Sequence, residues 1–298
     1  MTTTISSANA LAFSQNVDLL VQQMTSKIMD SCDVKDFPGS EGAQDVQQVG
    51  SIELDLVSAV DGDTNYGSPS HTSRWMFPKS YDKAFLIDKI SEIATIAEFK
   101  SPYVSTLAKA SMRVIDDVII ERYFGTNFTG KQGGTSQTFT AGNQIAATVG
   151  AAAATGLNPE KVLQGMEVLR QAEALDDSGM DPVICVISPK MQTDLLRFVE
   201  VSSGDFSSKR AYDAGQIPQG WMGCNWRISS RLPTNGSSHR RGMMYVKSGV
   251  CLGFWLRPAA ELFRDTAKKN NWATQIKMTL SASRREEAKC VELICAES

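Results

Sequence analysis

The chain has 298 residues, of which 42% are hydrophobic and 21% charged, and its formal net charge is -3. This composition excludes disordered and collagen-like proteins, and the length is enough to bury the core of one large domain or of two interleaved ones. The small negative charge argues against a dedicated nucleic-acid-binding protein. No run of about 18 apolar residues is present that would cross a membrane, and the N-terminus lacks the pattern of a signal peptide. Six cysteines without a C-x-x-C pair are typical of a cytoplasmic protein with reduced thiols.

The first part of the chain predicts an arm followed by a long hairpin. Apolar residues in 17–28 recur at helical spacing and predict an amphipathic N-terminal segment. Residues 51–56 alternate between apolar and polar, as in a half-buried strand, and turn-forming residues in 61–69 let 71–79 return as a second strand. Because a two-stranded hairpin has almost no core of its own, we expect it to pack on another subunit.

A long helix is predicted over residues 102–124, after a linking region at 81–99 that is expected to be partly helical. Its apolar residues fall three and four positions apart, Ser101 and Pro102 suit its start, and Gly125 suits its end. At about 1.5 Å per residue this helix is roughly 35 Å long, so it can form the spine of the subunit. Its apolar face is expected to pack on a C-terminal sheet that carries Ile276, Met278 and Leu280.

The remaining sequence predicts a compact α/β unit and a terminal hairpin. Residues 126–156 are expected to form loops with a short strand or two, 159–174 a helix capped by Asn158, and 182–187 a strand buried on both faces. Ser188 caps a further helix, and 221–256 is rich in strands. Residues 272–283 alternate, and we expect 289–295 to pair back on them as a long antiparallel hairpin.

The order of these parts resembles the major capsid proteins of tailed bacteriophages, over about residues 17–297. Several short words support the resemblance: Ser73-Arg74-Trp75, Val186-Ile187-Ser188-Pro189-Lys190, Lys247-Ser248-Gly249-Val250 and Trp272-Ala273-Thr274-Gln275. It implies an α+β chain with the Hong Kong 97-like fold. The implied parts are an N-terminal arm, an extended hairpin loop, a peripheral domain with a spine helix and a long antiparallel sheet, and an inserted axial α/β domain. Their expected ranges are 1–46, 47–82, 83–135 with 257–298, and 136–256.

The resemblance further implies a structural protein rather than an enzyme. Such a subunit self-assembles in the host bacterial cytoplasm into pentamers and hexamers of an icosahedral virion capsid. The capsid encloses double-stranded DNA, which the subunits contact without sequence specificity. The implied partners are other copies of the chain, a scaffolding protein, a portal protein and, in some shells, a decoration or cement protein. The starting Met favours a separate scaffolding protein over a cleaved segment. The alternative is an encapsulin-like nanocompartment shell that encloses a cargo enzyme.

Motifs that imitate enzyme sites fail on their context. Residues 125–131 match the first seven positions of a phosphate-binding loop, but Gln132 replaces the required Ser or Thr and a helix precedes the motif. Residues 61–72 begin like a calcium loop without its glycine and its final Glu. Asp116 and Asp117 are adjacent, so they point apart on a helix. With only two histidines in the chain, we predict no catalytic, cofactor or metal site.

Two groups of residues are candidate intersubunit contacts instead. The first group lies on the returning strand of the hairpin, where large side chains suit an interface, although packing against the chain's own spine helix is the alternative; it comprises Arg74, Trp75, Met76 and Phe77. The second group lies on the polar face of the spine helix, where salt bridges on the helix surface are the alternative; it comprises Arg113, Asp117 and Glu121.

Overall fold

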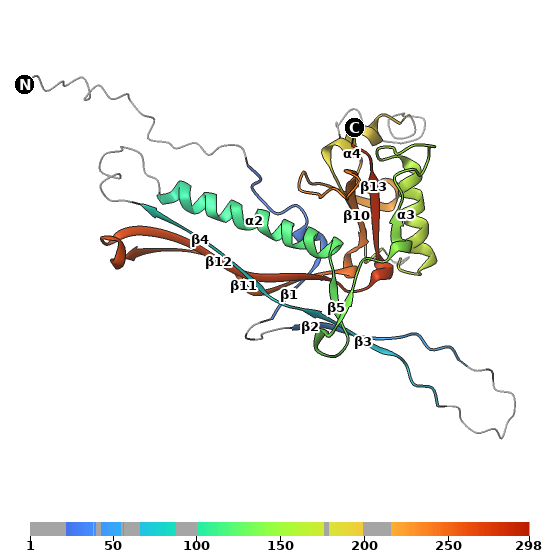
Figure 1. Ribbon diagram of the computed structural model, residues 1–298, viewed down its shortest axis with the longest axis horizontal. Helices are drawn as coiled ribbons and strands as arrows, with labels where there is room; N and C mark the ends of the chain where they lie inside the picture. Colours follow the sequence, from blue (N-terminus) through green and yellow to red (C-terminus); the bar gives the residue numbers. More distant parts are fainter. Residues whose placement is uncertain are drawn as a thin grey trace, which may run out of the picture.

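The computed structural model describes residues 22–37, 39, 43–54, 56, 66–87, 100–175, 179–198 and 216–297. This part of the chain has the expected α+β fold, with three helices and three sheets. The helices are α2 (Lys100–Phe124), α3 (Pro159–Gln171) and α4 (Pro189–Leu196). In Figure 1, α2 lies along a long sheet, a compact unit with α3 and α4 lies at one end of that sheet, and a thin hairpin projects away from the body.

The long sheet has the strand order β1-β11-β12-β4. Its strands are β1 (Asp33–Asp36), β4 (Lys79–Ile87), β11 (Val250–Asp265) and β12 (Asn271–Arg284). One face of β12 packs against α2, where Met278 and Leu280 share a core with Ile115 and Ile119. The predicted partner of the spine helix is therefore confirmed. The helix is apolar on this side because only a continuous apolar stripe can cover a sheet face over its whole length.

The compact unit contains a sheet of order β7-β13-β10-β8-β9. Its strands are β7 (Gln144–Ile145), β8 (Val183–Ile187), β9 (Cys224–Ile228), β10 (Arg240–Val246) and β13 (Cys290–Cys295). On β8, Cys185 belongs to the core under α3 and α4, whereas Ile184 and Val186 belong to the core shared with the spine helix. The uninterrupted apolar run of β8 follows from this position between two cores, as predicted.

The outer edge of this sheet is closed by a side chain. The amide of Gln219 donates a hydrogen bond to the Trp226 carbonyl oxygen at 2.9 Å and accepts one from the Trp226 N–H at 2.9 Å. The Gly220 N–H donates to the Cys224 carbonyl oxygen. Residues 219–220 thus occupy the backbone groups of β9 that a further strand would need.

The third sheet forms the base of the projecting hairpin, with the order β2-β3-β5-β6. Its strands are β2 (Ala43–Val49), β3 (His71–Met76), β5 (Asn127–Thr129) and β6 (Thr135–Gln137). β2 and β3 are antiparallel, and the Gly50 N–H donates to the Ser70 carbonyl oxygen. A hairpin with β3 as its returning strand is therefore present as predicted, but its first strand is 43–49 rather than 51–56. β5 and β6 widen its base, so only the outer part of the hairpin is without support from its own chain.

The prediction of a C-terminal hairpin was wrong. β12 pairs with β11 and β4, whereas β13 leaves the long sheet and pairs with β10 and β7. The reason is burial on both faces of β13: Val291 and Leu293 point into the core under α3, and Cys290 points into the core of the spine helix. A strand with two covered faces belongs inside a sheet that has structure on both sides.

Two further expectations need correction, and a third is tested only in part. Residues 81–87 of the linking region belong to strand β4, which pairs with β12, and the rest of that region, 88–99, lies outside the described residues. Residues 22–28 are not helical, although Ile28 is buried; the predicted helix over 17–21 lies outside the described residues. Residues 51–54 and 56 form no strand, and their apolar side chains are exposed rather than half-buried.

Candidate functional site and assembly surfaces

The described residues contain no cluster of three or more side chains that could hold a metal ion. The segment that imitates a phosphate-binding loop joins the end of α2 to β5, so a helix precedes it as predicted. No helix of the described part is long and apolar enough to cross a membrane.

The six cysteines are free thiols, as expected, and all are buried. Burial raises the pKa of Cys32 and of Cys295 to about 12 and raises the pKa of Cys185 and Cys290. Because the thiolate is the nucleophilic form, these side chains serve packing rather than covalent chemistry.

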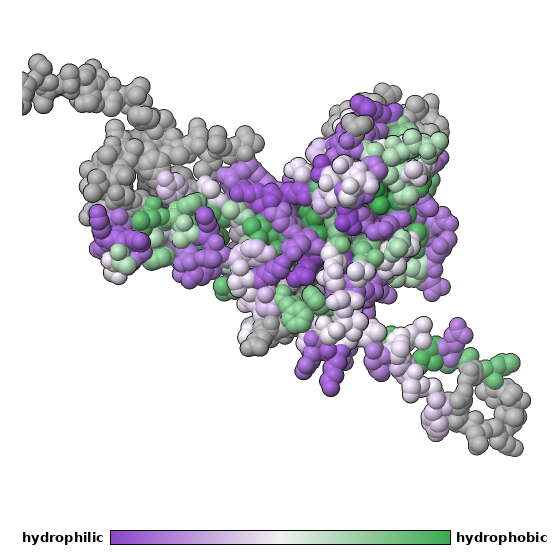
Figure 2. Space-filling model, viewed as in Figure 1, coloured by the Kyte–Doolittle hydropathy of each residue, from purple (hydrophilic) through white to green (hydrophobic). Residues whose placement is uncertain are grey.

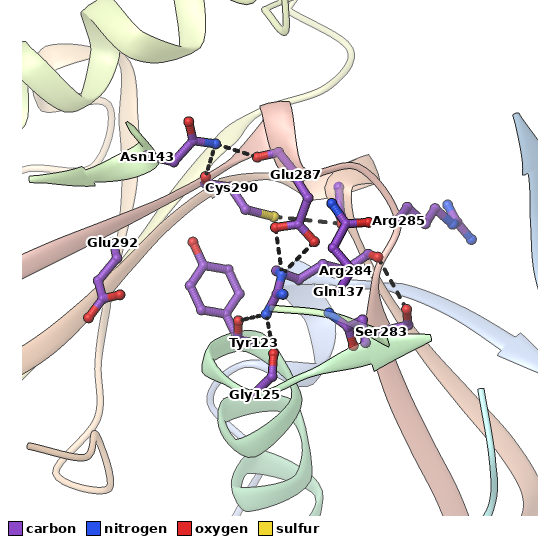
Figure 3. Close-up of polar contacts among 12 residues, drawn as sticks. Tyr123, Gly125, Gln137, Asn143, Ser283, Arg284, Arg285, Glu287, Cys290 and Glu292 are labelled. Carbon is purple, nitrogen blue, oxygen red and sulfur yellow. Dashed lines mark hydrogen bonds and ion pairs between the residues drawn. The ribbon is translucent and has the colours of Figure 1, made fainter. Parts of the chain in front are cut away.

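The end of the spine helix is capped by a fully buried arginine. Arg284, at the end of β12, donates from Nη1 to the carbonyl oxygens of Arg122 at 3.2 Å and Gly125 at 2.8 Å, and to that of Tyr123. Figure 3 shows its guanidinium between Glu287 and the last turn of the helix. The last carbonyl groups of a helix lack partners within it and carry partial negative charge, so a buried cation satisfies both requirements.

A carboxylate and a second arginine complete this site, which we call the buried junction: Arg74, Arg284 and Glu287. Arg284 Nε lies 3.0 Å from both oxygens of the Glu287 carboxylate, and Arg74 Nη1 lies 3.9 Å from it. Arg74 also donates from Nε to the Arg285 carbonyl oxygen at 2.7 Å and from Nη1 to Gln137 at 2.5 Å. The junction therefore joins the spine helix, the long sheet and the base of the hairpin.

The first group of predicted contact residues divides into two pairs. Arg74 and Met76 are buried within their own chain, and contact of this group with a neighbouring subunit stays a prediction. Trp75 and Phe77 are partly exposed. The Phe77 ring contacts Phe128 edge-on, with centroids 5.2 Å apart, and lies against Gly133, where a Cβ would come within 2.9 Å of it. The pairs divide because successive side chains of a strand point to opposite faces.

The second group lies on the spine helix, and each member has a partner in its own chain. Arg113 donates to the side-chain oxygen of Gln22 at 2.7 Å, and Glu121 pairs with Lys79 at 2.7 Å. Asp117 forms a two-pronged ion pair with Arg231. The Arg231 guanidinium comes from the loop after β9, so this pair links the spine helix to the compact unit. Contact with a neighbouring subunit stays a prediction for these three residues.

Asp116, which faces away from Asp117, holds the N-terminal segment on the spine helix. Its buried carboxylate accepts hydrogen bonds from the side chains of Gln23 and Ser26. It also accepts from the backbone N–H groups of Lys27 and Ile28, at 3.1 and 3.3 Å. These bonds hold residues 23–28 in a non-helical turn around one carboxylate.

The outer hairpin carries a row of exposed apolar side chains. Ile52 is 57% exposed, Leu54 98% and Leu56 94%, and the three residues alternate along the chain. Figure 2 shows hydrophobic residues along the projecting hairpin. Large apolar groups in a row, with no cover from their own chain, mark a surface that another molecule covers.

Arg284 was not predicted as a functional residue, although the sequence carries a signal for its burial. The alternation of 276, 278, 280 and 282 toward the spine helix continues to Arg284, which places this arginine on the buried face. The expected C-terminal hairpin instead places 284–287 between its two strands, in the turn. For Leu54 and Leu56 the alternation predicted burial of one face, but alternation alone does not tell whether the same chain or another molecule buries these side chains.

Comparisons with known proteins agree on one family. The family model for "Phage capsid protein" matches residues 5–297. The capsid structure of the cyanophage P-SCSP1u is similar with a TM-score of 0.74 and 16% identity, covering 98% of this chain and 94% of that chain. The capsid of the cyanophage Pam1 has a TM-score of 0.71 and 11% identity, with 97% of each chain covered.

A third solved structure, the head of Helicobacter pylori bacteriophage KHP40, has a TM-score of 0.70 and 10% identity, and covers 96% of this chain and 95% of that chain. The comparison with curated proteins gives no match. At these identities the solved structures establish the fold, and the family model establishes the membership. The chain belongs to the phage capsid protein family and has the Hong Kong 97-like fold of tailed-phage major capsid proteins.

Proposed function

We propose that this capsid subunit self-assembles into pentamers and hexamers of an icosahedral shell that encloses the double-stranded DNA of a tailed phage. The observation that carries the proposal is the exposed row Ile52, Leu54 and Leu56 on the outer hairpin. Burial of a leucine side chain is worth about 1.5–3 kcal/mol relative to exposure, so this row favours contact with a neighbouring subunit. Trp75 on the same hairpin is a further candidate for that contact.

Contacts with DNA in such a shell are directed to phosphate groups and do not depend on base sequence. Assembly takes place in the host bacterial cytoplasm, with a separate scaffolding protein, a portal protein and, in some shells, a decoration or cement protein as partners. The spine-helix residues Arg113, Asp117 and Glu121 are candidates for intersubunit contact in addition to their partners within the chain.

The four-part division of the chain is also a proposal, with two changes. We assign 1–46 to the N-terminal arm and 47–82 to the extended loop. The peripheral part is 83–135 with 257–289, and the axial part is 136–256 with 290–297, because β13 pairs with axial strands. Strand β11 crosses the boundary at 256, so the peripheral and axial parts share a continuous strand.

Electron microscopy of the purified protein tests the assembly. We expect closed icosahedral shells from the wild type and no shells from Leu54→Asp, because a charge in the apolar row opposes its burial. Ser51→Asp is the matched control: it adds the same charge on the opposite side of the extended segment, and its shells are expected to be normal. Circular dichroism checks that both variants are folded.

Two outcomes would contradict the proposal. Normal shells from Leu54→Asp would show that the apolar row does not lie in an interface. A wild-type protein that stays monomeric at high concentration would show that the subunit does not form a shell by itself. Shells isolated from infected cells are expected to hold nuclease-protected DNA. Shells that hold a cargo enzyme instead would support the encapsulin-like alternative.

A further inference from the structure

The buried junction contains more positive than negative charge. Arg284 is fully buried, Arg74 and Glu287 nearly so, and two guanidinium groups share one carboxylate. The C-terminal end of α2 supplies part of the missing negative charge, since a helix carries about half a negative elementary charge there. The carbonyl oxygens of Arg122 and Gly125 meet Arg284 on this side. The balance of charge thus depends on the positions of the helix end and of Glu287 together.

Arg74 enters the same balance from the hairpin. It lies on β3 where the hairpin sheet meets the body of the subunit, and its two short hydrogen bonds go to the Arg285 carbonyl oxygen and to Gln137 of β6. Its burial lowers its pKa, whereas the charge of Glu287 raises it. Among the described residues its guanidinium makes no hydrogen bond to α2, so within the junction Glu287 is the group that lies between Arg74 and the cap of the helix end.

We propose that Glu287 is a shared counter-ion that couples the extended hairpin to the end of the spine helix. When the hairpin moves and takes Arg74 with it, Glu287 keeps Arg284 as its single partner. The net charge of the junction next to the C-terminal end of α2 then changes. The stability of the last turn of α2 therefore depends on the position of β3, even though the Arg74 guanidinium makes no hydrogen bond to that turn. All three charges are buried or nearly so, and charges interact more strongly in a buried site than in water, which makes this dependence measurable.

Hydrogen–deuterium exchange of the full-length protein tests the coupling. In Arg74→Met, amides in the last turn of α2 are expected to exchange about tenfold faster, in addition to those of β3 and β5, because the junction loses one of its three charges. Glu287→Gln is expected to accelerate the same helix amides. In the Glu287→Gln background, adding Arg74→Met is expected to have no further effect on the helix, because its influence passes through the carboxylate.

Two controls separate coupling from a general loss of stability. Arg257→Met removes an exposed ion pair with Asp36 at the other side of β11 and is expected to leave the α2 amides unchanged. Arg74→Lys keeps the charge beside Glu287 but loses the forked bonds, so it is expected to loosen the hairpin base alone. The proposal is overturned if Arg74→Met leaves the helix amides unchanged, if its effect is as large without Glu287, or if Arg74→Lys loosens the helix equally.

Discussion

Replacing Asp116 with Ala is expected to release the N-terminal segment from the spine helix. The carboxylate accepts bonds from four residues, but the side chains of Gln23 and Ser26 can turn to water once it is gone. The N–H groups of Lys27 and Ile28 cannot, because the backbone here is held by the burial of Ile28. A buried donor without a partner costs about 1–3 kcal/mol, and the partly buried Lys27 amide adds about 1 kcal/mol, so we expect a loss of about 2–4 kcal/mol.

Urea denaturation followed by tryptophan fluorescence measures this loss as a change in the free energy of unfolding. Asp117→Ala is the matched control one position along the helix, since it removes a partly exposed pair with Arg231. It is expected to cost less than about 1 kcal/mol. Hydrogen exchange of the Lys27 and Ile28 amides gives the local measurement and should accelerate only in Asp116→Ala. Equal losses in the two variants, or unchanged exchange of these amides, would refute the role given to Asp116.

Two further predictions concern the hairpin and the thiols. Trp75→Ala is expected to impair shell assembly in electron micrographs more than it lowers the free energy of unfolding of the subunit, because the side chain is only half-buried within its own chain; normal shells from this variant would contradict it. Stability is expected to fall between pH 7 and pH 10, because Cys32 and Cys295 have folded-state pKa values of about 12 against an ordinary value of 9.0. Each thiol stabilises the fold fully below its unfolded pKa, and this contribution is lost as the pH rises toward the folded pKa. At pH 10 the loss is about 1.4 kcal/mol for each thiol. Because burial raises the pKa of Cys185 and Cys290 as well, these thiols add to the loss. Urea unfolding at both pH values measures it, and Cys295→Ala should reduce the difference by about 1.4 kcal/mol; a variant with the full difference would show that this thiol does not contribute to it.

The helices and the buried strand could be predicted because their signals are local. The spine helix was expected over 102–124 and spans Lys100–Phe124, since its caps and its apolar stripe lie within its own sequence. The same holds for α3, whose cap Asn158 accepts a bond from the Lys161 N–H as expected. The apolar run of β8 indicated burial on both faces without any knowledge of its neighbours.

The pairing of strands and the buried junction depend on residues far apart in the chain. β13 follows β12 after a short turn, and that closeness favoured a hairpin, whereas its buried Glu292 finds its partner in Arg241 of β10. Arg284 is 159 positions from Gly125, the helix-end residue that it caps. No local pattern predicts such a contact, because a charged residue is expected at the surface unless its buried partners are known.

The amide of Gln219 has a consequence for how axial parts can meet. Because it occupies the outer N–H and C=O of Trp226, β9 cannot receive a strand from a neighbouring molecule. In the proposed assembly, sheets of adjacent subunits that meet at this edge would therefore stay separate rather than fuse into one hydrogen-bonded sheet. Neighbours at this edge must recognise each other through side chains, which can slide and tilt by small amounts. In the proposed shell, an edge of this kind would let one chain fit both five-fold and six-fold rings, whereas a continuous ladder of backbone bonds would fix a single angle.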